Sequence, residues 1–283
     1  MIDKRRCIKI ISDNDDSSLR RIVHDRFSDD ESTSLAEVII QYGNTREMDI
    51  LLSEGYNFAF ADSLEYTLME YACLYEKPDL VKWLIDHDLG IQRYRYEFCY
   101  AAERNNLQIV KMLLDNGYSA SDVEESGRNG LHYAAQENYL ELCELLLKNG
   151  CAANQLDVDG FSPLYIASSE NNVEIVKLLL SAHAKVDLCG GDYTSPFVIA
   201  CSLGNYMICD ILLSHHADIN MQDIHGRTAL IYAAIKSDEK CIDYLLSHGA
   251  DSSIRDEHGY CFSDIQSNDK LREKLYYDEF IAD

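Results

Sequence analysis

The stretch Gly160–Leu180, GFSPLYIASSENNVEIVKLLL, decides how this chain folds. Its second half places apolar residues at intervals of three and four, which is the pattern of a helix with one buried face. Its first half opens with Ser162, a residue type that caps helices, and with Pro163, which suits a first helical turn. The stretch therefore predicts two short helices joined by a turn.

Residues of the same type recur along the chain, almost always 33 positions apart. A ladder of paired apolar residues comprises Leu51-Leu52, Leu84-Ile85, Leu113-Leu114, Leu146-Leu147, Leu179-Leu180, Leu212-Leu213 and Leu245-Leu246. A second ladder in the same phase comprises Ala72, Ala101, Ala134, Ala167, Ala200 and Ala233. A period of this length predicts a stacked array, in which each unit buries its apolar face against its neighbours.

The ladders resemble the ankyrin repeat, whose pattern includes a T-P-L-H-x-A-like helix start, a Leu-Leu pair and a closing Gly-Ala. The best matches to the helix start are Gly127–Ala135, Gly160–Ala167 and Gly226–Ala234, and looser matches are Thr67–Ala72 and Ser195–Ala200. The resemblance covers about residues 35–255. It implies an all-α fold, an ankyrin-repeat solenoid of helix-turn-helix units with projecting β-hairpin loops and atypical terminal capping helices.

The chain then divides into three parts. Residues 1–34 are expected to form N-terminal capping helices or a divergent repeat, residues 35–255 about seven repeats, and residues 256–283 a C-terminal capping repeat or helix. The last helix, Asp269–Phe280, is either a cap or a recruitment motif. The step of 29 residues between Leu84 and Leu113 predicts a shortened loop near Asp86–Arg95. Full hairpins are expected near Glu124–Asn129, Leu156–Ser162, Leu188–Ser195, Met221–Thr228 and Ile254–Cys261.

The ends of the second helices follow a simple rule. Gly117, Gly150 and Gly249 stand where a left-handed backbone conformation closes a helix. His183 and His216 replace that glycine in two units, which predicts local strain or a shifted turn.

Composition limits the classes of partner. The 283 residues include 49 Asp and Glu against 25 Lys and Arg, a net charge of −24. Binding to duplex nucleic acid or to anionic lipid depends on Lys and Arg, so neither is expected. The acids are spread along the chain; residues 157–189, for example, contain five acids and two bases. We expect a protein partner with a basic surface.

The location follows from what the sequence lacks. It has no run of 18 apolar residues and no uninterrupted apolar N-terminal stretch, so neither a membrane span nor a secretory signal is expected. Its ten cysteines include no CxxC pair. Free thiols in a reducing cytoplasm are therefore expected, and Lys4–Arg6 also allow a nuclear location.

Catalytic chemistry is not expected. The sequence has no phosphate-binding loop, no metal-ligand spacing and no nucleophile motif, so we predict no enzyme activity, cofactor or metal. Cys143, Cys201 and Cys209 occupy apolar or small positions of the repeat, where cysteine acts as a small hydrophobe. Cys241 is among six cysteines whose role is less determined, and a regulatory thiol among them stays open. His132 is expected to hydrogen-bond between adjacent units.

Function is then expected to be recognition, with the chain a monomeric scaffold or adaptor. The resemblance implies binding on a concave surface lined by the first helices and the hairpins. The residues expected there are Tyr94, Tyr96, Arg128, His132, Glu137, Asn138, Phe161, Tyr165, Glu170, Tyr193, His225, Arg227, His258 and Tyr260. Asn205 and Asp238 are expected to extend the same lining.

Three further interpretations stay open. The chain could be a regulatory or substrate-receptor subunit of an enzyme complex such as a ubiquitin ligase. Its richness in Tyr and Asn and its three prolines also suit a host-directed effector or inhibitor of a pathogen. Asp218-Ile219-Asn220 resembles the ankyrin context in which an asparaginyl hydroxylase acts, so Asn220 is either modified or a bonding residue of the turn.

Overall fold

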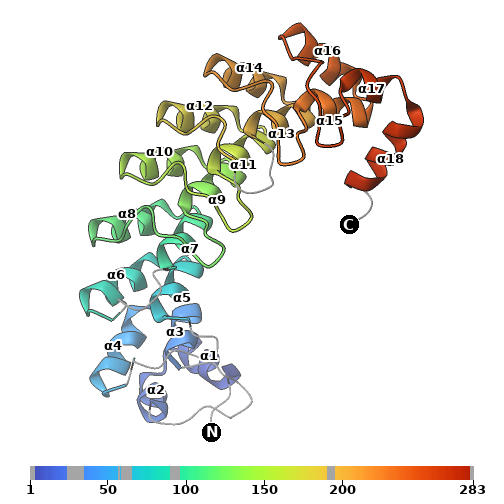
Figure 1. The fold of residues 1–283 in the computed structure, drawn as a ribbon. Helices are drawn as coiled ribbons and strands as arrows, with labels where there is room; N and C mark the ends of the chain where they lie inside the picture. Colours follow the sequence, from blue (N-terminus) through green and yellow to red (C-terminus); the bar gives the residue numbers. More distant parts are fainter. Residues whose placement is uncertain are drawn as a thin grey trace. The chain divides into compact units, whose positions relative to one another are not determined.

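The computed structural model describes residues 4–23, 35–56, 58, 66–89, 96–189 and 195–280. Within these ranges the regular structure is helical, and the only β-bridge is the isolated pair Arg255 and Cys261. The chain separates into two compact units, Met1–Glu124 and Glu125–Asp283. Each unit is a stack of helix pairs (Figure 1).

The first unit contains four helix pairs. First helices pack on one another, α1 on α3, α3 on α5 and α5 on α7, and second helices do the same, α2 on α4, α4 on α6 and α6 on α8. The pairs are α1 (Lys4–Ser12) and α2 (Asp16–Ile22), α3 (Leu35–Tyr42) and α4 (Thr45–Ser53), α5 (Leu68–Leu74) and α6 (Pro78–Asp86), and α7 (Glu97–Glu103) and α8 (Leu107–Asp115).

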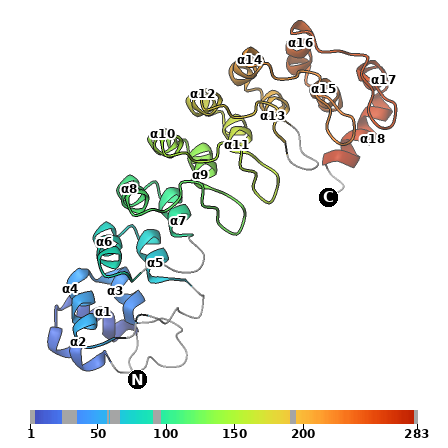
Figure 2. The same cartoon turned by 60° about the vertical axis from the view of Figure 1, so that its left-hand side comes forward.

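The second unit continues the pattern with five pairs. In two views, α9, α11, α13 and α15 form one row and α10, α12, α14 and α16 form another, and the long loops project from the first row (Figures 1 and 2). The pairs are α9 (Gly130–Glu137) and α10 (Leu140–Lys148), α11 (Pro163–Ser169) and α12 (Val173–Ser181), α13 (Pro196–Ser202) and α14 (Tyr206–Ser214), α15 (Ala229–Lys236) and α16 (Glu239–Ser247), and α17 (Phe262–Gln266) and α18 (Asp269–Phe280).

Side-chain caps start the first helices where the sequence predicts. The Ser162 hydroxyl accepts a hydrogen bond from the backbone N–H of Tyr165 at 3.1 Å, and Pro163 opens the helix behind it. The Thr228 hydroxyl accepts from Ile231 N in the same way. Each cap satisfies a backbone donor that has no partner inside the helix.

Left-handed residues end the second helices, as predicted. Gly117 and Gly150 have φ of +86° and +79°, and His183 and His216 adopt the same region at +62° and +68°. The two histidines therefore accept a conformation that costs a side chain roughly 1–2 kcal/mol and glycine almost nothing. The turn after the second helix therefore has the same conformation in these two repeats, and His183 and His216 have the strained backbone.

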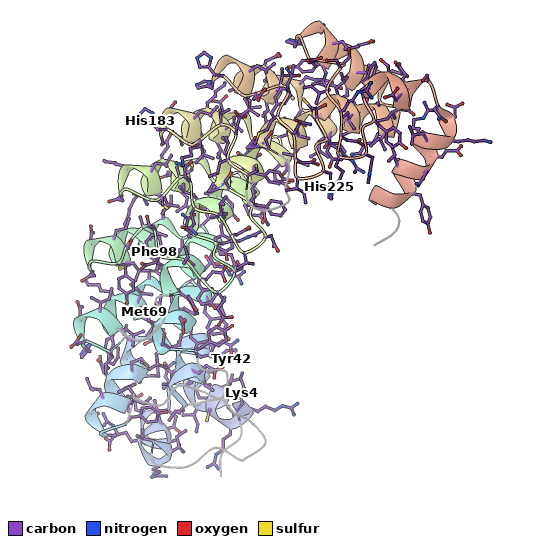
Figure 3. All side chains as sticks on the ribbon, viewed as in Figure 1. Lys4, Tyr42, Met69, Phe98, His183 and His225 are labelled. Carbon is purple, nitrogen blue, oxygen red and sulfur yellow. The ribbon has the colours of Figure 1, made fainter. Side chains whose placement is uncertain are left out.

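The predicted ladders form the core. In each apolar pair the first leucine is fully buried, as at Leu51 and Leu146, whereas the second is more exposed in most pairs, as at Leu52 and Leu246, and is buried at Leu180. The ladder alanines are buried where neighbouring first helices meet. Met69 and Phe98, marked in Figure 3, fill the interior of the first unit without any exposed surface. The repeat thus sets the packing register.

The N-terminal helices pack as a divergent repeat would. Helix α1 lies on α3, and α2 lies on α4. The Lys4 ammonium lies 6.0 Å from the centre of the Tyr42 ring, a cation–π contact that also joins α1 to α3 (Figure 3). The second helix spans Asp16–Ile22, and residues 24–34 lie outside the described residues.

The last helix has the predicted bounds and an unexpected packing partner. Helix α18 turns back onto α15 and α17, where Leu275 is buried. Leu271 is half-buried, and the other described side chains of the helix are mostly exposed. Helix α18 thus packs on α15 and α17, and its role as a cap stays a prediction.

Candidate protein-binding face

The loops that join successive helix pairs are here called fingers, and three of the described ones are closed by an aspartate. In the finger 157–161, Asp157 Oδ1 accepts hydrogen bonds from the N–H groups of Asp159 and Phe161, at 3.1 and 2.8 Å. Asp157 N also donates to Phe161 O at 3.0 Å. The fingers 223–227 and 256–260 have the same bonds and the same Asp-x-x-Gly order. These are hairpin-like turns rather than β-strands.

Neighbouring fingers stack through main-chain atoms. Val158 N donates to Ser126 O, and Glu257 N donates to His225 O, both at 2.8 Å. Gly127 and Gly226 make this approach possible, because a Cβ on either would lie 3.1–3.2 Å from the backbone of the next finger. Both also have positive φ, so two independent reasons require glycine here.

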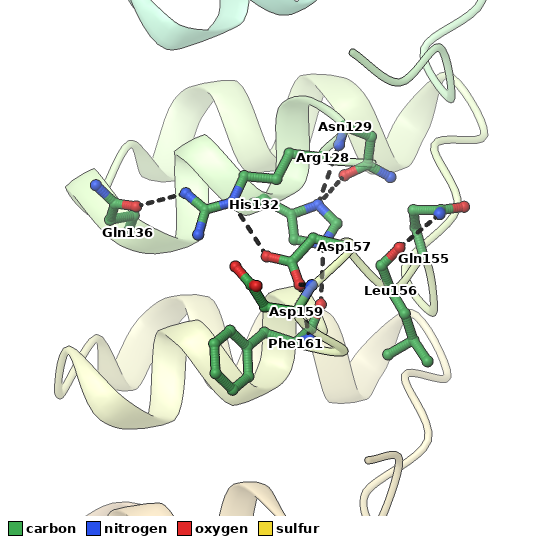
Figure 4. Close-up of polar contacts among 9 residues, drawn as sticks. All are labelled: Arg128, Asn129, His132, Gln136, Gln155, Leu156, Asp157, Asp159 and Phe161. Atoms are coloured by element: carbon green, nitrogen blue, oxygen red, sulfur yellow. Dashed lines mark hydrogen bonds and ion pairs between the residues drawn. The ribbon is translucent and has the colours of Figure 1, made fainter. Parts of the chain in front are cut away.

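His132 joins one repeat to the next from a buried position. Its Nδ1 accepts from Asn129 N at 3.1 Å, and its Nε2 donates to Phe161 O at 3.2 Å (Figure 4). The tautomer is assigned from these two backbone partners. Burial lowers the pKa of His132 to about 4, so the ring is neutral at pH 7. The prediction of an inter-repeat hydrogen bond is confirmed, but His132 has no exposed surface and cannot line a binding face.

Arg128 and Asp157 form an ion pair beside this histidine. Arg128 Nε lies 3.1 Å from Asp157 Oδ2, and Arg128 Nη1 donates to Gln136 Oε1 at 3.0 Å (Figure 4). The carboxylate is buried and the guanidinium is partly exposed. Arg128 is therefore fixed in place and still reaches the surface.

Arg227 occupies the corresponding position in a later repeat and is 6% exposed. Its backbone N–H donates to Asp223 Oδ1 at 2.8 Å, and its guanidinium lies 5.9 Å from the centre of the Tyr232 ring. The Tyr232 hydroxyl in turn donates to Asp223 Oδ2 at 2.5 Å. The expectation that Arg227 lines the binding face is wrong, because it packs inside its own finger.

The remaining expected contact residues divide into two groups. Glu137, Asn138, Glu170 and His258 are exposed, and Tyr96, Phe161, Tyr165, His225 and Tyr260 are half-buried. Phe161 and Tyr165 stack on each other with ring centres 4.5 Å apart. His225 Nδ1 lies 2.7 Å from a Glu257 carboxylate oxygen of the next finger. Tyr94 and Tyr193 lie outside the described residues.

Two apolar finger tips were not predicted from the sequence. Val158 is 70% exposed and Ile224 is 52% exposed, each directly after the aspartate that closes its finger. The Asp-x-x-Gly order with an apolar second residue was the available signal. We define the finger face as the finger tips Val158, Ile224, His225 and His258 together with Arg128, Glu137, Asn138 and Glu170.

Amides tie the repeats together at the turns between paired helices. Asn172 Nδ2 donates to Ala135 O at 2.8 Å, and Asn205 Nδ2 donates to Ser168 O at 3.0 Å, in each case across to the preceding repeat. Asn205 was expected to line the binding surface, and the structure instead gives it this bridging bond.

A second set of bridges runs along the other side of the repeats. Asn154 Oδ1 accepts from Lys185 N, and Asn220 Oδ1 accepts from Asp251 N, both at 2.8 Å. The side chain of Asn220 thus holds the next repeat, which is the bonding role that the sequence allows. Hydroxylation of Asn220 stays a prediction, which mass spectrometry of the Asn220 peptide from cells with the hydroxylase would test.

Neither a metal-holding cluster nor a membrane-spanning helix is found among the described residues. No cluster of three His, Cys, Asp or Glu side chains among them is arranged to hold a metal ion. None of their helices combines the length and the apolar character that a bilayer span requires. The exposed features are finger tips and acidic helix ends, which suit contact with a macromolecule.

Comparison with known proteins also identifies ankyrin repeats in this chain. The family model of ankyrin repeats in three copies matches residues 98–189 and 182–256. An ankyrin repeat protein of Fowlpox virus (strain NVSL) is 29% identical over 102 residues, which are 35% of this chain and 72% of that protein. The ankyrin repeat and SOCS box protein 6 of Pongo abelii and of Homo sapiens are each 29% identical over 120 residues, 40% of this chain and 28% of those proteins.

The repeat register, the paired helices, the stacked fingers and the family match agree over more than half of the chain. Repeats of this kind serve protein–protein interaction. The chain belongs to the ankyrin-repeat family.

Proposed function

We propose that the chain is a protein–protein interaction scaffold or adaptor that binds a basic partner on the finger face. The observation that carries this proposal is that main-chain atoms and side chains of the fingers have different roles. Main-chain hydrogen bonds stack them, so tip side chains such as Val158 and Ile224 stay exposed and have no part in that bond. Exposed apolar tips beside charged rims are typical of protein contact sites.

The charge of this face favours a partner with Lys or Arg. Glu137 and Glu170 stand at equivalent positions of neighbouring repeats, both exposed, and the chain as a whole carries −24. Complementary charge mainly raises the association rate and selects the partner. The partner's basic surface, the monomeric state and a cytoplasmic location, with a nuclear one allowed, are parts of this proposal.

Affinity capture followed by mass spectrometry would identify the partner, and two variants would then test the face. Glu137→Lys with Glu170→Lys should weaken binding about tenfold or more and reduce its dependence on salt. Glu144→Lys is the matched control, because Glu144 is equally exposed but lies on α10, in the other row of helices. Equal losses in both variants would contradict the proposed face, and so would binding that is insensitive to salt.

A second candidate is a substrate-receptor subunit of a ubiquitin ligase or a similar complex. It is favoured by the likeness to proteins named for ankyrin repeats and a SOCS box. A second docking element would then be needed, and α18 presents Tyr277, which is 57% exposed. Tyr277→Ala should remove one of two captured partners if the chain is such a receptor, and neither if it is a simple scaffold. The viral relative likewise motivates a host-directed inhibitor, for which capture from host extract is the direct test.

A further inference from the structure

Three cysteines from two neighbouring repeats meet at one point. Cys201 belongs to α13, Cys209 to α14 and Cys241 to α16. The sulfurs of Cys201 and Cys209 lie 3.2 Å apart, and the Cys241 thiol donates to the carbonyl oxygen of Cys201 at 3.6 Å. Cys201 therefore touches both of the other cysteines.

We call the contact between the α13–α14 repeat and the α15–α16 repeat a joint, and the repeat register explains why this joint differs from the others. The position of Cys241 is filled by a larger buried residue in each earlier repeat of the register, namely Ile109, Leu142, Ile175 and Ile208. The smaller cysteine leaves a cavity of about 10 Å³, which is room for one water-sized molecule. Cys241 lines this cavity together with Ser202, Lys236 and Asp238.

The bridging amide is also missing from this joint. Asn172 and Asn205 donate to Ala135 O and Ser168 O, and the next member of that series is Asp238, opposite Cys201 O. An ionised carboxylate has no hydrogen to donate. Asp238 instead accepts from Cys241 N at 3.1 Å, and the Cys201 carbonyl keeps the weak thiol donor. A joint with fewer strong bonds and a cavity opens more readily than its neighbours.

Local charges separate the roles of the thiols. The hydrogen bond from Cys201, assisted by Lys236, lowers the pKa of Cys241 against the opposing effects of burial and Asp238. The contact with Cys209 first, then that with Cys241, together with burial, raises the pKa of Cys201, whose thiol keeps its proton. The thiolate is the form that attacks an oxidant, so Cys241 reacts first and Cys201 follows.

We propose that Cys241 is a peroxide-reactive thiol and that its oxidation ends in a disulfide with Cys201. The Cys241 sulfur attacks one peroxide oxygen and the O–O bond breaks, which leaves a sulfenic acid and releases one water. The Cys201 sulfur then attacks the Cys241 sulfur, and the hydroxyl departs with the Cys201 proton as a second water. One peroxide is reduced, two thiols are oxidised, and the new bond joins α13 to α16 across two repeats.

The test treats the native full-length chain with hydrogen peroxide and maps every cysteine by differential alkylation and mass spectrometry. The expected product is a linked pair of peptides containing Cys201 and Cys241, lighter by two hydrogen atoms. Cys73 is the internal reference, because it is fully buried and the charges of Glu97 and Glu70 add to burial in raising its pKa. Cys241 should be oxidised about tenfold faster than Cys73.

Three variants keep the result interpretable, and each introduces a residue that the array already holds at the same position of another repeat. Cys201→Ala follows Ala135, and it should halt the reaction at a Cys241 sulfenic acid that a cyclic diketone traps. Cys209→Val follows Val176 and should leave the disulfide intact. Cys241→Ile follows Ile208 and should abolish it. Oxidation of Cys241 no faster than that of Cys73, or an unchanged disulfide yield in Cys241→Ile, would overturn the proposal.

Discussion

His132 and Phe161 are 29 residues apart in sequence and are joined by a hydrogen bond of 3.2 Å from Nε2 to the carbonyl oxygen. The bond uses the neutral ring, and burial lowers the pKa of His132 from 6.5 to about 4. Below pH 6.5 His132 is protonated in the unfolded chain, whereas in the folded chain it stays neutral until the pH approaches 4. The contribution to stability is therefore complete above pH 6.5 and is lost as the pH falls toward 4.

This relationship predicts a pH effect on unfolding. Between pH 7.5 and 5.5 the free energy of unfolding should fall by about 1.4 kcal/mol more in the wild type than in His132→Gln, which cannot titrate. Urea titrations of both proteins at the two pH values measure the difference. Parallel pH dependence in the two proteins would show that the ring is accessible to protons.

The stacked fingers predict unequal costs for two glycines. Gly226 and Gly259 both have positive φ, but only at Gly226 would an added Cβ lie within 3.1–3.2 Å of the backbone of a further finger. Gly259→Ala should cost about 1–2 kcal/mol from backbone strain alone, and Gly226→Ala should cost more. Thermal unfolding of the two variants measures the extra cost at Gly226 that comes from the close approach of the next finger. Equal costs for Gly226→Ala and Gly259→Ala would contradict this prediction.

The broken series of amides predicts a stabilising substitution. Asp238→Asn should restore the bond to Cys201 O, as Asn172 and Asn205 bond the preceding repeats, and it should raise the free energy of unfolding by about 1 kcal/mol. The reverse change, Asn205→Asp, should lower it by about 1–3 kcal/mol, because Ser168 O loses its donor. Asp243→Asn, an exposed change on the same helix, controls for charge. A stabilisation by Asp243→Asn equal to that by Asp238→Asn would assign the effect to charge.

The histidines that end two second helices predict that exchanging His for Gly, and Gly for His, at this position changes stability in opposite directions. His183→Gly should relieve left-handed strain and raise stability by about 0.5 kcal/mol, after subtraction of glycine's greater freedom in the unfolded chain. Gly150→His, at the same position one repeat earlier, should lower stability by a similar amount. Denaturant midpoints of the two variants should move in opposite directions. A shift of both in one direction would mean that the side chain, rather than φ, decides the effect.

The sequence allowed the helices, their caps and their register to be predicted because these depend on a fixed period. Leu146 and Leu179 are buried for the same reason, so finding one locates the other. Positions such as His132 in α9 and Arg227 in a finger were harder, since the residue type suits both a surface and a buried polar network. Their burial depends on the next finger, whose approach a single repeat does not reveal.

The packing of α18 and the meeting of the cysteines were missed for different reasons. Helix α18 carries few apolar residues, so its periodicity marks a helix but not the neighbour on which it lies. Cys201 and Cys241 are 40 residues apart, and their contact follows only when the repeats are superimposed. Superposition also shows Asp238 where the two preceding repeats have Asn172 and Asn205, a difference that a position-by-position alignment of the repeats makes visible in the sequence.

The hydrogen bonds from Val158 N to Ser126 O and from Glu257 N to His225 O connect atoms that every amino acid possesses, apart from the proline nitrogen. The side chains at these four positions can therefore be exchanged without loss of the stack. A library randomised at Ser126, Val158, His225 and Glu257, with proline omitted at Val158, His225 and Glu257, should yield mostly folded members. The same freedom lets natural variation alter what such a chain recognises while the scaffold beneath it stays as it was.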